Sequence, residues 1–106
     1  MTDLEYIAEN LSDEDILCQI AEEAAELAQA ALKLRRAITQ TNPTPVKMEE
    51  ALDGFFEEYG DVEGACAVFA EKNRLNGKDV FELLARQIES KYDRWVKRIK
   101  EGKKHD

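Results

Sequence analysis

Long stripes of apolar residues at helical spacing are the feature that most restricts what this chain can fold into. The first stripe begins at Ile16, and its members recur every three, four or seven residues for about seven helical turns. Two breaks interrupt the stripes: residues 39–46 contain both prolines, and residues 73–77 end in the turn signal Asn76-Gly77. Five Gly and two Pro in 106 residues are too few for the many turns of a β-rich fold, so the sequence predicts an all-α protein. The apolar positions of the three stripes are Ile16, Ile20, Leu27, Ala31, Leu34 and Ile38, then Leu52, Phe55, Phe56, Tyr59, Val62, Cys66 and Phe69, and last Phe81, Leu84, Ile88, Trp95 and Ile99.

The predicted architecture is an antiparallel bundle of three long helices, preceded by a short helical arm at residues 3–10. Ser12 stands three residues before Asp15, and Asp79 stands three residues before Glu82. This is the spacing of a capping box, so Ser12 and Asp79 are each expected to cap the helix that follows.

The length of the chain suits a single helical domain, with its core in residues 13–100 and a frayed tail at 101–106. A chain this small buries a smaller share of its surface than a larger domain does. Its apolar stripes are also wide and rich in aromatic residues. We therefore expect several copies to associate and complete the bundle, as a homodimer or homotetramer.

Charge, and the scarcity of Cys and His, exclude several classes of function. With 15 basic and 23 acidic residues the net charge is −8, which argues against a nucleic acid polymer as partner. Cys18 and Cys66 form no metal-binding motif, and His105 is the single histidine, so a Cys/His zinc site and a His-based triad are excluded in one chain. No signal-peptide pattern opens the chain, and no uncharged apolar run reaches the ~18 residues of a membrane span. We expect no membrane partner and a cytoplasmic location.

Two pairs of acidic residues interrupt the apolar stripes of the first two long helices. Glu23 follows Ile20 by three residues, and Glu26 lies one turn further on; Glu58 and Asp61 repeat this spacing in the second helix. Like charges at this spacing repel, and burying them unpaired is costly, so they require basic partners or a bound cation. Four carboxylates on two facing helices suit Mg²⁺, with Mn²⁺ as the alternative. The plainer interpretation is that all four acids belong to solvated helix faces.

The segments AEEAAELAQAAL (21–32) and EEYGDVEGA (57–65) resemble the E-E-x-x-E … E-x-x-D signature of the MazG-like all-α nucleoside triphosphate pyrophosphohydrolases. The resemblance covers about residues 13–98, most of the chain. It implies a Mg²⁺-dependent hydrolase that cleaves a nucleoside triphosphate to the monophosphate and pyrophosphate. It also implies dimers or tetramers in which helices of two subunits complete each site.

The same resemblance implies roles for individual acidic residues. The metal ligands of the family correspond to Glu23, Glu26, Glu58 and Asp61, and Glu22 fills the acidic position just before them. An acidic residue that is not fully committed to the metal, either Glu22 or Glu23, is expected to take the proton of the attacking water.

Lys91 and Arg94, in the sequence KYDR, resemble a Lys-aromatic-x-x-Arg element that members of the family often carry. Cations at these positions are expected to bind the triphosphate oxygens of the substrate. The alternative is that they are ordinary basic residues of a helix surface.

Three functions therefore compete for this sequence. The first is a pyrophosphohydrolase acting on canonical or altered (d)NTPs. The second is a relative in the same superfamily with a dedicated substrate, such as phosphoribosyl-ATP or a pyrimidine deoxynucleotide such as dUTP. The third is a non-enzymatic helical interaction module whose acidic residues only keep it in solution. Metal binding separates the first two from the third, and a panel of substrates separates the first from the second.

Overall fold

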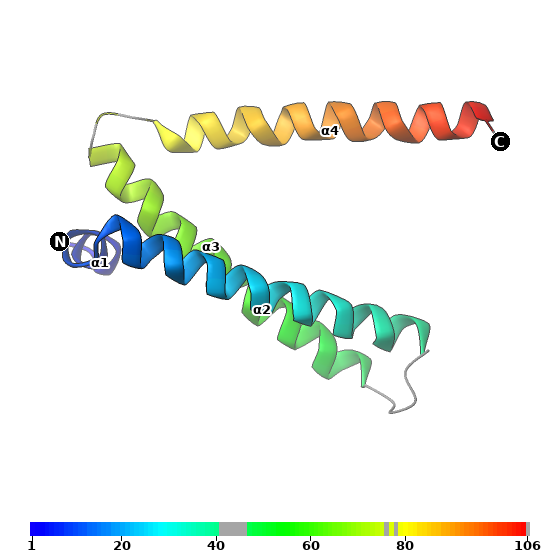
Figure 1. Cartoon of the computed structure of the whole chain (residues 1–106), viewed down its shortest axis with the longest axis horizontal. Coiled ribbons are helices and arrows are strands. Elements are labelled where there is room, and N and C mark those ends of the chain that lie inside the picture. Colours follow the sequence, from blue (N-terminus) through cyan, green and yellow to red (C-terminus); the bar gives the residue numbers. More distant parts are fainter. Residues whose placement is uncertain (41–46, 76, 78, 106) are drawn as a thin grey trace. The chain divides into compact units, whose positions relative to one another are not determined.

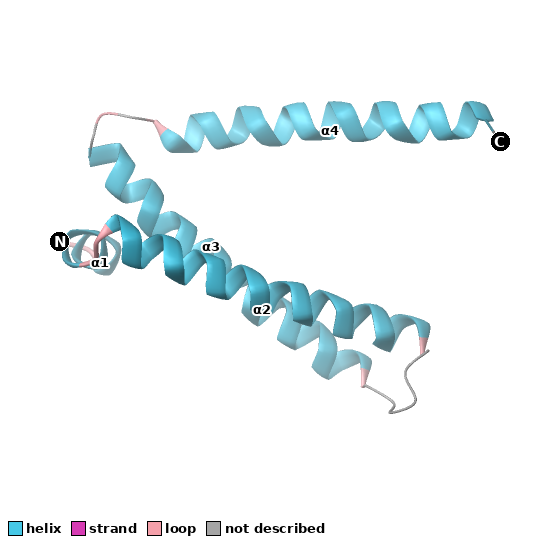
Figure 2. Ribbon diagram, in the orientation of Figure 1, coloured by secondary structure: helices cyan, strands magenta, loops and turns pink. Residues whose placement is uncertain are grey.

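The computed structural model describes residues 1–40, 47–75, 77 and 79–105, and these residues form helices and no strand. The prediction of an all-α protein is confirmed (Figures 1 and 2). The last helix continues to His105, through most of the segment that we expected to be a frayed tail. The helices are α1 (Asp3–Asn10), α2 (Asp13–Thr39), α3 (Met48–Leu75) and α4 (Val80–His105).

Side-chain caps start the helices where the sequence predicts them. The Ser12 Oγ accepts a hydrogen bond of 3.1 Å from the backbone N–H of Asp15, and the Asp79 Oδ1 accepts one of 3.0 Å from that of Glu82. Both bonds satisfy an N–H group that the first turn of a helix leaves unpaired. α2 ends at Thr39, and the residue that caps it, Gln40, has a left-handed backbone (φ 53°) that closes the last turn. The rest of the predicted proline-containing loop, residues 41–46, lies outside the described residues.

Residues 1–72 form one compact unit, in which α1 and the antiparallel pair α2 and α3 pack together (Figure 1). Its core lies at the end where α2 begins and α3 ends, and Ile16 is its most completely buried large side chain. Lys72 fastens this end, because its Nζ donates to the Leu11 carbonyl and lies 3.7 Å from Asp13 Oδ1. The core residues are Ala8, Ile16 and Val68, with Leu4, Ile20 and Phe69 packed against them.

The predicted stripes are only partly covered within this unit. On α2, Leu27 and Leu34 are half-buried as expected, but Ile38 is 61% exposed. On α3, Phe56 is 60% and Tyr59 49% exposed. A helix that packs against one neighbour buries only a narrow part of its surface. The apolar stripes of α2 and α3 are wider than that buried part. Apolar surface is therefore left over on α3.

α4 belongs to a second unit, residues 73–106, and its long apolar stripe is roughly half exposed, as Trp95 at 54% and Ile88 at 46% illustrate. Side-chain contacts within α4 are local: Arg86 pairs with Glu82 at 2.5 Å, and the Lys91 ammonium lies 5.7 Å from the ring centre of Trp95. Local contacts of this kind leave a single helix marginally stable in water. No helix within the described ranges combines the length and the apolar stretch that crossing a membrane requires.

Candidate metal centre

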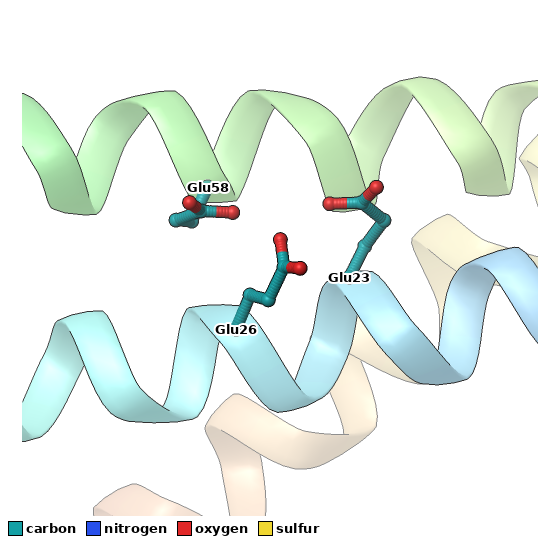
Figure 3. Close-up of side chains that lie close together, drawn as sticks. All are labelled: Glu23, Glu26 and Glu58. Atoms are coloured by element: carbon teal, nitrogen blue, oxygen red, sulfur yellow. The ribbon is translucent and has the colours of Figure 1, made fainter.

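Three of the four predicted metal ligands come together between α2 and α3. Glu23 and Glu26 reach in from α2 and Glu58 from α3, and each places a carboxylate oxygen within 4.8 Å of the others (Figure 3). We call these three residues the carboxylate cluster. Asp61, the fourth predicted ligand, is not a member, although it stands one turn after Glu58 and lines a groove together with Glu23.

Two oxygen atoms of the cluster are inaccessible to solvent and have no hydrogen-bond partner. They are the Oε2 atoms of Glu23 and Glu58, both on half-buried side chains. The other oxygen of Glu23, Oε1, accepts a bond of 2.6 Å from the Gln19 side-chain amide, which holds this carboxylate in place. A buried acceptor without a donor is costly. A cation within reach of such an atom would offset this cost.

The electrostatics of the cluster favour binding of a positive charge. Partial burial raises the pKa of the Glu58 carboxyl above its ordinary value, and the neighbouring Glu26 carboxyl raises it further. The negative charges of Glu26, Asp61 and Glu23 act in the same direction. Without a metal, the fold therefore favours a proton on Glu58, and a divalent cation would relieve the same repulsion.

The donor set indicates which class of cation fits. The three side chains that form the cluster offer only carboxylate oxygens, and hard oxygen donors are the ligands that Mg²⁺ and Mn²⁺ prefer. Acidic groups on a solvated face would have water-accessible oxygens, whereas two oxygens here are shielded. The residues present thus fit a magnesium or manganese ion.

Two grooves border the cluster on the first unit, and their chemistry differs. The first, which we call the apolar groove, has a volume of about 470 Å³ and meets the cluster at Glu23. Its other lining residues are Leu4, Ile7, Leu11, Ile16, Gln19, Gly60, Asp61, Gly64, Ala65 and Val68.

The second groove, which we call the polar groove, has a volume of about 550 Å³ and meets the cluster at Glu26 and Glu58. It contains two basic side chains, Lys33 and Arg36. Its remaining lining residues are Gln29, Ala30, Glu50, Ala51 and Gly54.

Other predicted site residues lie outside the cluster. Glu22 is exposed on α2 and lines neither groove. Lys91 and Arg94 are exposed on α4, where with Trp95 and Arg98 they line a hollow of about 300 Å³. The Arg94 guanidinium donates a 3.0 Å hydrogen bond to the Ser90 hydroxyl. The substrate-binding role of these two cations stays a prediction.

The sequence interpretation missed three polar residues beside the cluster: Gln19, Lys33 and Arg36. Helical periodicity contains the signal for two of them. Gln19 precedes Glu23 by one turn, and Lys33 follows Glu26 by two turns, so that it points within about 20° of the same direction. Lys33 and Arg36 also stand in the last turns of α2, where basic residues are explained by the helix dipole alone. Because the helix dipole already accounts for these two residues, their position in a groove was not predicted.

Comparisons of this chain with protein-family models, with curated proteins and with solved structures found no match. The resemblance to MazG-like enzymes therefore depends on the sequence motifs of α2 and α3. Its functional implications are taken up below as a proposal.

Proposed function

We propose that this protein is a Mg²⁺-dependent nucleotide pyrophosphohydrolase that cleaves a (d)NTP to the monophosphate and pyrophosphate. The observation that carries the proposal is the carboxylate cluster, in which Glu23 and Glu58 each have a shielded oxygen without a hydrogen-bond donor. Grooves adjoin this cluster on α2 and α3 and give a substrate access to it. The sequence resemblance supplies the reaction type.

The residues around the cluster have distinct roles in this proposal. Glu23, Glu26 and Glu58 hold the metal, with Asp61 as the fourth ligand. When bound, Mg²⁺ would polarise phosphate oxygens and lower the pKa of a nearby water. Glu22 or Glu23 accepts the proton of the attacking water, and the Gln19 amide keeps the Glu23 carboxylate oriented.

Charge that develops on the phosphates needs cations, and Lys91 and Arg94 are proposed to supply them. Among the described residues that line the two grooves and the cluster there is no Ser, Cys or His. The side chains at this site therefore lack the usual groups for a covalent intermediate, which favours direct attack by water.

The bond that is cleaved can be read from the products. We expect nucleoside monophosphate and pyrophosphate, released only when Mg²⁺ or Mn²⁺ is present. The chain has no G-x-x-x-x-G-K-[ST] loop to cradle the phosphates for transfer of the γ-phosphoryl group. The measurement is pyrophosphate release across all NTPs and dNTPs, followed by chromatography of the nucleotide products. Diphosphate and orthophosphate as primary products would contradict the proposed bond.

Two alternatives predict different outcomes of the same panel. A dedicated enzyme would cleave one substrate, such as dUTP or separately supplied phosphoribosyl-ATP, and leave the others intact. A non-enzymatic interaction module would hydrolyse none of them and would bind no metal at the cluster. The shielded, unpartnered oxygens of Glu23 and Glu58 favour the two enzymatic alternatives.

We further propose that the active form is a homodimer or homotetramer in the cytoplasm. Exposed apolar side chains on α3 support association, because Leu52, Phe56 and Tyr59 recur at helical spacing and are each at least 38% exposed. Uncovered surface of this kind marks a protein interaction face.

Light scattering tests the oligomeric state directly. At tens of micromolar we expect the mass of a dimer or a larger assembly, and Phe56→Asp is expected to shift the equilibrium toward the monomer because it places a charge in the apolar face of α3. Glu57→Asp, which changes the neighbouring exposed residue, is the matched control. A monomer mass for the unmodified protein would refute the association.

A further inference from the structure

We propose that the polar groove holds the β- and γ-phosphates of the substrate, which leave as pyrophosphate, and that Lys33 and Arg36 bind them. This inference rests on the proposed function, since it assigns a direction to the substrate at the same carboxylate cluster. It adds two phosphate-binding residues on α2 to those that the sequence motifs indicate.

The geometry of α2 places both cations along one path from the cluster. Lys33 lies two turns beyond Glu26, a rise of about 10 Å along the axis, and Arg36 lies about 5 Å further. Helical side chains lean toward the N-terminus of their helix, so both long side chains lean back toward Glu26. Both line the same groove as Glu26 and Glu58.

The opposite direction from the cluster is unsuited to phosphates. The apolar groove is lined mainly by aliphatic side chains and Gly, and its polar members are Gln19 and the acidic Glu23 and Asp61. No Lys or Arg is among its described lining residues. A polyphosphate there would lose its hydration without gaining a cation. The phosphates are therefore directed into the polar groove, with the less charged part of the substrate on the other side.

Both cations are available to a ligand, and the groove attracts an anion once the cluster is neutralised. In the described ranges, neither the Lys33 nor the Arg36 side chain forms a hydrogen bond or an ion pair. Glu50 is the only acidic lining residue besides the two cluster members Glu26 and Glu58. A divalent cation offsets two of the negative charges of the cluster, and the two charges of Lys33 and Arg36 then outnumber that of Glu50. Pyrophosphate should therefore bind only together with the metal.

Gly54 keeps the groove open on the α3 side. A Cβ added there would meet no other atom within 4 Å, so close packing within the chain does not require the glycine. Glycine inside a helix costs roughly 0.5–1 kcal/mol relative to Ala. Gly54 lines the polar groove. The lack of a side chain there leaves room for a ligand in that groove.

Isothermal calorimetry with inorganic pyrophosphate and Mg²⁺ tests the inference without requiring turnover. The unmodified protein is expected to bind pyrophosphate with Mg²⁺ and not in EDTA. The double variant Lys33→Ala/Arg36→Ala is expected to bind at least about tenfold more weakly, because each cation supplies a charge-assisted hydrogen bond. Arg35→Ala removes an exposed cation that lines neither groove and is the matched control. Circular dichroism confirms that each variant is helical.

A second variant tests the groove by filling it. Gly54→Leu adds a side chain at a position where a Cβ meets no atom within 4 Å, and it replaces a poor helix former with a good one. We expect an unchanged or higher thermal midpoint together with loss of pyrophosphate binding. A purely structural role of Gly54 would not produce this combination.

The outcomes separate this inference from the proposed function. No binding of magnesium pyrophosphate by the unmodified protein, or equal binding by the double variant, would overturn the inference, whatever the activity. An equal loss in Arg35→Ala would also overturn it, because the effect would then be one of overall charge. Pyrophosphate binding that depends on Lys33 and Arg36, combined with no hydrolysis of any nucleotide, would support the phosphate-binding role of the polar groove and refute the proposed enzymatic function.

Discussion

Replacing Glu58 with Gln is expected to lower Mg²⁺-dependent pyrophosphate release by at least about 100-fold. Groups that merely support a metal ligand typically cost 10–100-fold when they are changed, and Glu58 is a proposed ligand with a shielded oxygen. Gln keeps the size of the side chain but removes its charge, so the helical fold should persist. The measurements are initial rates of pyrophosphate release, circular dichroism, and Mn²⁺ binding followed by electron paramagnetic resonance.

Glu63→Gln is the matched control for this variant. Glu63 is an exposed acid on the same helix that lines neither groove, and its replacement makes the same change in net charge. We expect it to retain unmodified rates and unmodified Mn²⁺ affinity. The Asp61→Asn variant tests whether Asp61, the fourth predicted ligand, binds the metal together with the carboxylate cluster. Unmodified activity in both Glu58→Gln and Asp61→Asn would make the site assignment wrong.

Much of the local structure follows from the sequence because local rules govern it. The caps at Ser12 and Asp79 form as their spacing predicts. The proximity of Glu23 and Glu26 to Glu58 is harder to predict from the sequence, because it depends on how α2 is aligned along α3. Acidic residues within two apolar stripes indicated that register, because the stripes are the surfaces that pack.

The sequence does not show which residues of each apolar stripe are buried within the chain. Periodicity assigns Ile38 and Phe56 to apolar faces, yet both are about 60% exposed. Apolar residues that face another copy have the same pattern as those that face the core, so sequence alone does not distinguish the two. The polar groove was missed for a related reason, because the cations Lys33 and Arg36 already had a sufficient explanation at the C-terminal end of a helix.

The second large effect is a reversal of stability between Glu58→Gln and the unmodified protein when metal is added. The fold raises the pKa of Glu58, so the metal-free native state binds a proton there more readily than the unfolded chain does. Stability then falls as the pH rises from the ordinary carboxyl range through the raised pKa. At neutral pH in EDTA, Glu58→Gln is expected to be the more stable protein. This advantage should disappear below the ordinary carboxyl range.

Saturating Mn²⁺ should reverse that order. A ligand at 100 times its dissociation constant stabilises the native state by about 2.7 kcal/mol, which corresponds to a rise of roughly 10–20 °C in the midpoint for a small domain. The unmodified protein is expected to show this rise, and Glu58→Gln much less of it. Thermal scans at one fixed protein concentration, with EDTA or Mn²⁺, provide the measurement, and Glu63→Gln should follow the unmodified protein in both.

The reversal is the sharper test because the Glu58 carboxylate is expected to lower the stability of the metal-free protein and to raise that of the metal-bound protein. Carboxylates that merely face solvent would repel weakly without metal and gain nothing from it, so Glu58→Gln and the unmodified protein would respond alike. A structural Glu58, bonded to a basic partner, would make Glu58→Gln less stable in EDTA. Only a carboxylate that is strained in the free protein and satisfied by a cation gives a variant that is more stable without metal and less stable with it.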